Sequence, residues 1–250
     1  MTAEREIHIF PDLPALFEAA AEDFIRLAKA AVDARGRFTV ALSGGSTPKG
    51  LFQVLSGRDR NLLPWDKMFF FWGDERHVPP DHADSNYRMA RETLLSKVPV
   101  PEQNIFRVPA EDADAEQAAA QYEDTLKKFF ALAPGQLPEF DLIHLGMGPD
   151  GHTASLFPNT KGLHETQRLV IANWVEKFST FRITFAAPVL NAAREVEFLI
   201  AGADKAPALY EVIEGNGSSE LYPSKLIRPG HGKLVFFLDA SAAEKLKSVA

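Results

Sequence analysis

Asp150 and His152 are two residues apart, and their side-chain types could together carry out proton transfer. They lie in and just after a loop, residues 146–151, that holds three glycines and one proline in six positions. Such glycine density lets the backbone approach a ligand closely. An imidazole can act as a base near neutral pH, and a neighbouring carboxylate can fix its tautomer. We therefore expect His152 to act as a general base that Asp150 orients.

The segment before this loop explains how the pair would be positioned. Residues 141–147 form a short apolar run bounded by turn signals, which predicts a buried strand. The loop then lies at the carboxyl end of a strand, where open α/β sheets place their ligands. His144 lies within the strand itself, and we expect it to be structural.

A second glycine turn follows the apolar strand predicted over residues 38–42. Thr47 and Pro48 favour the N-cap and first position of a helix that continues to about Leu55. A strand, a glycine turn and a helix N-terminus together form an anion-binding arrangement, because free N–H groups and the positive end of the helix dipole converge. The residues expected to bind an anion are Gly44, Gly45, Ser46 and Thr47. The turn lacks the Gly-x-Gly-x-x-Gly pattern of a dinucleotide site.

Three cations lie at or just beyond the ends of predicted strands, namely Arg76, Arg182 and Lys205. They are candidates for binding an anionic ligand, since loops at that edge of a sheet converge. An ordinary salt bridge is the alternative explanation for each.

Composition restricts the other possibilities. The chain has 250 residues, a net charge of −7 and no cysteine, which excludes disulfides and thiolate metal sites. The negative charge disfavours nucleic acid and anionic membranes as partners. We expect a cytoplasmic protein, because the start of the chain lacks signal-peptide features and long apolar runs are missing. We also expect a monomer or weak homo-oligomer. Residues 81–84 do not have standard metal-ligand spacing, so we expect no metal.

Strands alternate with helices along the chain, which predicts a mostly parallel sheet covered on both faces. No linker separates domains, so we expect one domain over residues 1–250. The predicted strands are 6–10, 38–42, 68–72, 105–108, 141–147, 169–174, 182–185, 195–202 and 234–238. The predicted helices are 13–35, 47–55, 85–97, 113–131, 188–193, 205–214 and 241–248, with Ser85 and Asp204 as caps.

The segment from Gly146 to Pro158 resembles the signature of the 6-phosphogluconolactonase family. Three further blocks agree in order, Leu42–Pro48, Trp72–Pro79 and Ala201–Ala206, and the resemblance extends from about Phe38 to Asp239. It implies a Rossmann-like three-layer α/β sandwich, shared with glucosamine-6-phosphate deaminases and ribose-5-phosphate isomerases.

The resemblance implies hydrolysis of 6-phospho-D-glucono-1,5-lactone to 6-phosphogluconate, the second step of the oxidative pentose phosphate pathway, without metal or cofactor. His152 would activate water, and backbone N–H groups of the 146–151 loop would stabilise the oxyanion. Arg182 and Lys205 match the family's phosphate-contacting cations, and Arg76 lies in its Gly-Asp-Glu-Arg block. Relatives often carry Lys-Pro-Pro before the Arg182 block, whereas this chain has Lys177-Phe178-Ser179-Thr180.

Two other functions remain to be distinguished. A glucosamine-6-phosphate deaminase shares the fold and an Asp-Gly-His loop, but Phe157 stands where its signature has a ring-opening glutamate. A non-catalytic sugar-phosphate sensor would have no need of His152, and the chain has no helix-turn-helix segment or basic patch for DNA.

Overall fold

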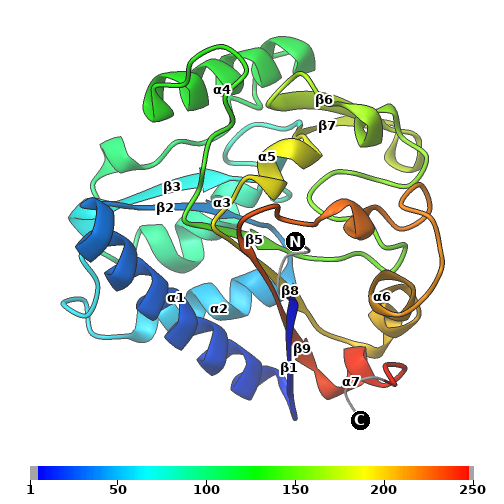
Figure 1. The fold of residues 1–250 in the computed structure, drawn as a ribbon. Helices are drawn as coiled ribbons and strands as arrows, with labels where there is room; N and C mark the ends of the chain where they lie inside the picture. The colour runs from blue at the N-terminus through cyan, green and yellow to red at the C-terminus, as the bar shows by residue number, and fades with distance from the viewer. Residues whose placement is uncertain (1–4, 248–250) are drawn as a thin grey trace.

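A six-stranded parallel sheet forms the centre of the computed structural model, which describes residues 5–247 (Figure 1). Every neighbouring pair in the sheet is parallel, so the carboxyl ends of its strands lie along one edge. The order across the sheet is β1 (Arg5–Phe10), β9 (Lys233–Asp239), β8 (Glu195–Ile200), β5 (Leu142–Leu145), β2 (Phe38–Leu42) and β3 (Met68–Trp72).

The two faces of this sheet are covered differently (Figure 1). On one side lie α1 (Leu13–Arg35), α2 (Ser46–Gly57) and α3 (Asn86–Ala90). On the other side lies a small antiparallel sheet with α4 (Ala115–Phe130) and α5 (Ala187–Asn191). The expected α/β class, a Rossmann-like layered fold with a mostly parallel sheet, is confirmed. The remaining helices are α6 (Ala206–Ile213) and α7 (Ala240–Ala243), and short 3₁₀ turns lie at residues 65–67, 102–104, 161–164, 176–178, 203–205 and 223–226.

Helix α1 shows why the predicted boundaries were accurate where the local signals were strong. The Asp12 side chain accepts a hydrogen bond from the N–H of Ala15 at 2.9 Å and so caps the helix start. Gly36 ends the helix in the left-handed conformation, with φ of 75°. Within residues 5–247, no helix combines the length and apolarity that spanning a membrane requires.

The small sheet was not predicted. It has the order β4 (Asp74–Arg76), β7 (Thr180–Phe185), β6 (Val170–Val175), and both pairs are antiparallel. Residues 74–76 were not among the predicted strands, and Arg76 was expected to lie just beyond the end of one. They instead pair with a strand more than 100 residues later, which brings Arg76 opposite Arg182.

The start of α2 differs from the prediction in a way that bears on the site. The helix begins at Ser46, and its N-cap is Gly45 with φ of 106°, so the prediction of Thr47 as N-cap is wrong. Glycine adopts that backbone conformation at little cost. Among the described residues, no side chain caps this helix.

Three further local predictions are corrected. Residues 105–108 are not a strand, because Ile105 makes only one isolated bridge, to Phe70. Ser85 does cap α3, accepting from the N–H of Arg88, but the α-helix ends at Ala90 and a π-helical segment continues over residues 91–95. Asp204 is not a cap, because its carboxylate pairs with Lys205 at 2.7 Å and α6 begins only at Ala206.

The last helix also differs from the predicted one. Helix α7 is shorter than the 241–248 predicted, and it starts one residue earlier, at Ala240. Its cap is Asp239, whose side chain accepts from the N–H of Ala242 at 2.8 Å. Residue 248 lies outside the described residues.

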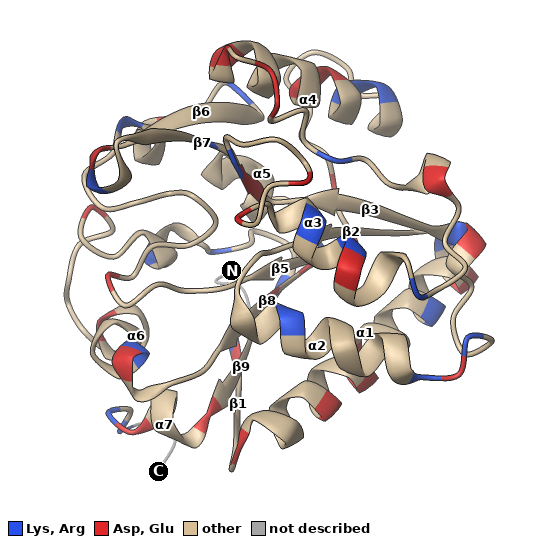
Figure 2. Cartoon of the chain, turned by 180° about the vertical axis from the view of Figure 1, so that it is seen from behind, with Lys and Arg blue, Asp and Glu red and all other residues tan. Residues whose placement is uncertain are grey.

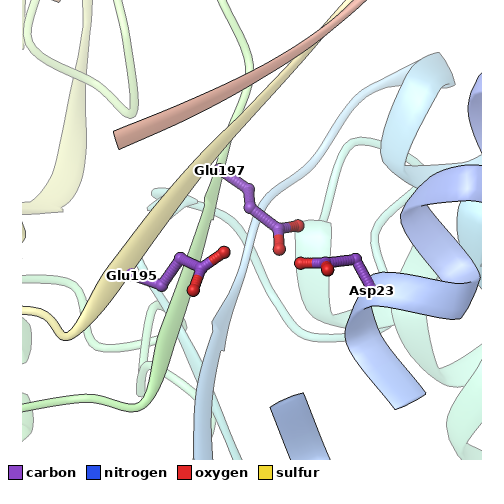
Figure 3. Close-up of side chains that lie close together, drawn as sticks. All are labelled: Asp23, Glu195 and Glu197. Atoms are coloured by element: carbon purple, nitrogen blue, oxygen red, sulfur yellow. The ribbon is translucent and has the colours of Figure 1, made fainter. Parts of the chain in front are cut away.

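Asp23, Glu195 and Glu197 form an acidic cluster between α1 and the first half of β8, which we call the buried acidic cluster (Figure 3). The two glutamates are buried and Asp23 is half-buried. One oxygen from each carboxylate lies within 4.8 Å of the others. Burial and the charge of Asp23 raise the pKa of Glu195 to about 7 and that of Glu197 well above its ordinary value. His144 Nε2 lies 3.1 Å from Glu197, and burial lowers the pKa of His144 to about 4. This cluster is at the opposite end of β8 from the cavity described below.

Candidate active site

A cavity of about 380 Å³ opens at the carboxyl ends of β2, β5 and β8. Four of the predicted site elements line it together: the glycine turn before α2, Arg76, His152 and Lys205. Asp150 and Arg182 lie outside its wall, each next to a residue that lines it. The other polar residues that line it are Ser43, Asp74, Asn86 and Asp204, none of which was predicted to belong to the site.

The glycine turn presents the start of α2 to the cavity. No side chain in the described part of the chain caps this helix, and Ser46 and Thr47 of its first turn line the cavity. The first N–H groups of the helix are therefore available to an anionic ligand there. Gly44 is required for close packing, since a Cβ at residue 44 would lie 1.8 Å from the side-chain oxygen of Asn86. Asn86 is held in turn by donating from Nδ2 to the carbonyl oxygen of Asp74 at 3.0 Å.

His152 and Asp150 form a direct contact, with 2.5 Å between Nδ1 of the imidazole and Oδ1 of the carboxylate. Burial alone would raise the pKa of Asp150, but hydrogen bonds and positive charge from His152 and Lys177 outweigh it and hold that pKa well below its ordinary value. An ionised carboxylate only accepts hydrogen bonds, so Nδ1 of His152 is the donor. In the neutral imidazole, Nε2 is then left as the proton acceptor.

An aromatic ring fixes the plane of the imidazole. The rings of His152 and Phe157 are stacked, with 4.0 Å between their centroids and 21° between their planes. Phe157 is almost fully buried. The residue that stands in place of the deaminase glutamate therefore packs against the candidate base.

The loop of residues 146–151 uses part of its own backbone internally. The N–H of Gly148 donates to the carbonyl oxygen of His152, and the N–H of Gly151 donates to that of Gly148, both at 2.9 Å. These two groups stabilise the turn and are not free to bind an oxyanion. The expectation that the whole loop supplies oxyanion donors is therefore corrected for residues 148 and 151.

Two arginines face each other across the small sheet. Arg76 and Arg182 are directly paired in the register of β4 and β7. Burial, and then the charge of Arg76, lower the pKa of Arg182. Like charges opposite each other destabilise a strand pair, so their presence here is typical of a site for an anion. Arg76 also donates to the backbone oxygen of Asp84, and Arg182 lies 5.3 Å from the ring of Phe178.

Glu75 holds the loop that carries Arg76. It is buried and accepts from the N–H groups of Arg76, Asn86 and Tyr87 at 2.7–2.8 Å, and from the hydroxyl of Ser85 at 3.1 Å. Burial raises its pKa, with the backbone donors opposing that effect. Glu75 therefore connects β4 to the start of α3.

The charges around the cavity act locally. On the side of the molecule shown in Figure 2, acidic and basic positions are interspersed along helices and loops. The net charge of the chain is −7. An anionic ligand would therefore be attracted by the cations of the cavity and the start of α2, not by the overall charge.

Comparison with known proteins agrees with this geometry. The family described as glucosamine-6-phosphate isomerases/6-phosphogluconolactonase matches residues 11–236. The chain belongs to this family. It is 44% identical over 243 residues to the 6-phosphogluconolactonase of Nostoc sp., covering 97% of this chain and 99% of that one. It is 47% identical over 222 residues to the 6-phosphogluconolactonase of Synechocystis sp., covering 89% and 90% of the two chains.

Solved structures of the family have the same fold. The 6-phosphogluconolactonase of Trypanosoma brucei superposes with a TM-score of 0.89 at 29% identity, over 98% of this chain and 100% of that one. The fold is therefore shared with this solved structure over nearly the full length of the chain.

Proposed function

We propose that this protein is a 6-phosphogluconolactonase that hydrolyses 6-phospho-D-glucono-1,5-lactone to 6-phosphogluconate. The observation that carries the proposal is that His152, on the wall of the cavity, is paired with an ionised Asp150 just behind it. The same cavity is lined by an uncapped helix start and by cations. Membership of the family, and the names of relatives 44–47% identical to this chain, support the same substrate.

The reaction needs an activated water and stabilisation of one oxyanion. Nε2 of His152 takes a proton from water as the water oxygen bonds to the lactone carbonyl carbon. The carbonyl oxygen becomes an oxyanion, which we assign to loop N–H groups other than those of Gly148 and Gly151. When the intermediate collapses, the bond from that carbon to the ring oxygen breaks, and the imidazolium returns its proton to the ring oxygen.

The phosphate of the substrate binds away from the reacting carbon. The N–H groups at Gly44, Gly45, Ser46 and Thr47 bind its oxygens, and charge-assisted contacts come from Arg76, Arg182 and Lys205. The like-charge pairing of Arg76 and Arg182 is relieved when a dianion lies between or beside them.

The test is disappearance of the lactone at neutral pH, measured against a control without enzyme because such lactones also hydrolyse unaided. We expect turnover well above that control. Release of ammonia from glucosamine 6-phosphate would indicate a deaminase instead. Binding of the lactone without turnover would indicate a sugar-phosphate sensor.

A further inference from the structure

We propose that Lys177 is a positioning residue for His152 and that it acts through Asp150. The inference rests on the proposed function, because it concerns the base of that reaction. Lys177 lies outside the wall of the cavity, on the turn between β6 and β7.

The contacts form a line of three side chains. The ammonium of Lys177 lies 3.0 Å from Oδ2 of Asp150, and Oδ1 of the same carboxylate lies 2.5 Å from Nδ1 of His152. Each carboxylate oxygen thus has one charged or polar side-chain partner. With both oxygens engaged, the carboxylate can neither rotate nor turn away from the imidazole without losing one charge-assisted contact.

The turn that carries Lys177 has a specific backbone. A 3₁₀ turn over Glu176–Phe178 is followed by Ser179 in the left-handed conformation, with φ of 48°, and the N–H of Ser179 donates to Glu176 at 3.0 Å. Proline cannot adopt a positive φ or donate this bond. A Lys-Pro-Pro sequence at residues 177–179 would therefore need another turn, so this placement of Lys177 depends on the Phe178-Ser179 sequence.

The same turn also reaches the imidazole by packing. The ring of Phe178 meets that of Phe157 edge-on, with centroids 5.7 Å apart, and Phe157 stacks on His152. Lys177 itself lies 5.2 Å from the ring of Phe178. The turn therefore restrains the direction of the imidazole through Asp150 and its plane through Phe157.

Because Lys177 lies at the surface, its effect on His152 can be measured without disturbing the fold. Its side chain is 54% exposed, and exposed ion pairs contribute little to stability. Substitution should therefore leave the fold intact while removing a positive charge from beside Asp150.

We expect Lys177→Met to lower kcat about tenfold, because a base that is less firmly oriented spends less time in the reactive geometry. KM should stay within about twofold, since the phosphate contacts lie elsewhere. With Lys177 gone, the unbalanced charge of Asp150 favours the imidazolium. The acid limb of kcat/KM should therefore move to higher pH, by about 0.5–1 unit for a charge on the order of 6 Å away.

The other charged groups near His152 are unchanged in this variant. Those that share the cavity wall with it come from β4 and from the 3₁₀ turn before α6, and they are Asp74, Arg76, Asp204 and Lys205. A change in the pH profile of the variant thus reports the loss of the Lys177 charge.

The experiment compares Lys177→Met with Lys177→Arg, which keeps the charge, and with Lys127→Met, which removes a similarly exposed lysine from an ion pair with Glu123 on α4. Steady-state kinetics across pH are combined with an NMR titration of the His152 ring, assigned with His152→Asn. We expect the Met variant at residue 177 to show the shift in both measurements, and the other two variants to match the wild type.

Two results would overturn the inference while the proposed function stands. In the first, the wild type is active and the Lys177→Met variant has the same kcat and the same His152 titration as the wild type. The other is a rise in KM alone, which would place Lys177 on the substrate. A wild type that does not hydrolyse the lactone would overturn the proposed function instead, whereas the NMR titration would still test the coupling of Lys177 to His152.

Discussion

Gly148 lies against the imidazole of His152 so closely that a Cβ at residue 148 would be 2.1 Å from Nδ1 and from Cε1 of that ring. The same Cβ would be 2.7 Å from Oδ1 of Asp150. Gly148 also donates its N–H to the carbonyl oxygen of His152 at 2.9 Å. The glycine is therefore needed for the space it leaves beside the side chains of His152 and Asp150.

We expect Gly148→Ala to displace the imidazole and lower kcat by about 10²-fold, since small misplacements of a catalytic group can cost that much. KM should change less, because the phosphate contacts are on other elements. The matched control is Gly57→Ala at the end of α2, where a Cβ would meet open space among the described residues. Comparable activity of the two alanine variants would contradict the proposed packing.

His152→Asn tests the base directly. Asparagine keeps a hydrogen-bonding edge but cannot take the proton, so kcat should fall by about 10²–10⁴-fold. Binding should persist, because the candidate phosphate contacts remain. The assay must subtract spontaneous hydrolysis, which accelerates in base.

Near-normal kcat in His152→Asn would refute the assignment of the base. Asp150 would then be the next candidate. Glu75 is a less suitable candidate, because four hydrogen bonds hold its carboxylate within the framework.

Arg182→Ala tests the anion site. Loss of one charge-assisted contact, about 2 kcal/mol, should raise KM roughly 30-fold with a smaller effect on kcat. Within residues 5–247, no carboxylate forms an ion pair with Arg182, and the residue directly opposite it in the strand register is Arg76. The melting temperature should therefore stay level or rise. Lys205→Ala should raise KM similarly.

Normal binding combined with lost turnover in Arg182→Ala would show that this arginine does not hold the phosphate. Arg88→Ala is a suitable control, because Arg88 is an exposed arginine paired with Glu92 on the outside of α3. That variant should leave both kcat and KM unchanged.

The sequence predicted the central sheet well because each of its strands carries a local signal. The apolar runs at residues 38–42 and 68–72 form β2 and β3 with the predicted bounds. The run at 105–108 has a similar pattern but makes a single bridge. Whether such an apolar run forms a strand or makes only one bridge depends on its pairing in the folded structure. The local sequence of residues 105–108 does not determine that pairing.

The sequence pointed to several residues of the candidate site, but it did not predict the side-chain contacts between them. Glycine turns, His152 and the cations at strand ends are visible in the sequence because they interrupt apolar patterns. The contact of Lys177 with Asp150 spans 27 residues, and that of Asp74 with Ser155 spans 81. Such contacts depend on how the small sheet packs beside the loop, which the local sequence does not determine.

The buried acidic cluster provides a prediction about stability. Burial and Asp23 raise the pKa of Glu195 to about 7, above the 4.5 of an ordinary glutamate. In the folded protein Glu195 therefore retains a proton at pH values where the unfolded chain has lost it. Between pH 4.5 and 7 the folded state binds more protons, so this residue lowers the free energy of unfolding progressively as pH rises, and the loss is complete above pH 7.

Glu195→Gln removes this penalty because glutamine stays neutral. We expect the variant to be about 1–2 kcal/mol more stable than the wild type at pH 8, with a much smaller difference at pH 5. The measurement is urea unfolding at both pH values. The control is Glu92→Gln, which changes an exposed glutamate and should show no comparable gain at pH 8. An equal effect of Glu195→Gln at pH 5 and pH 8 would mean that the free energy difference comes from packing and not from the charge of the cluster.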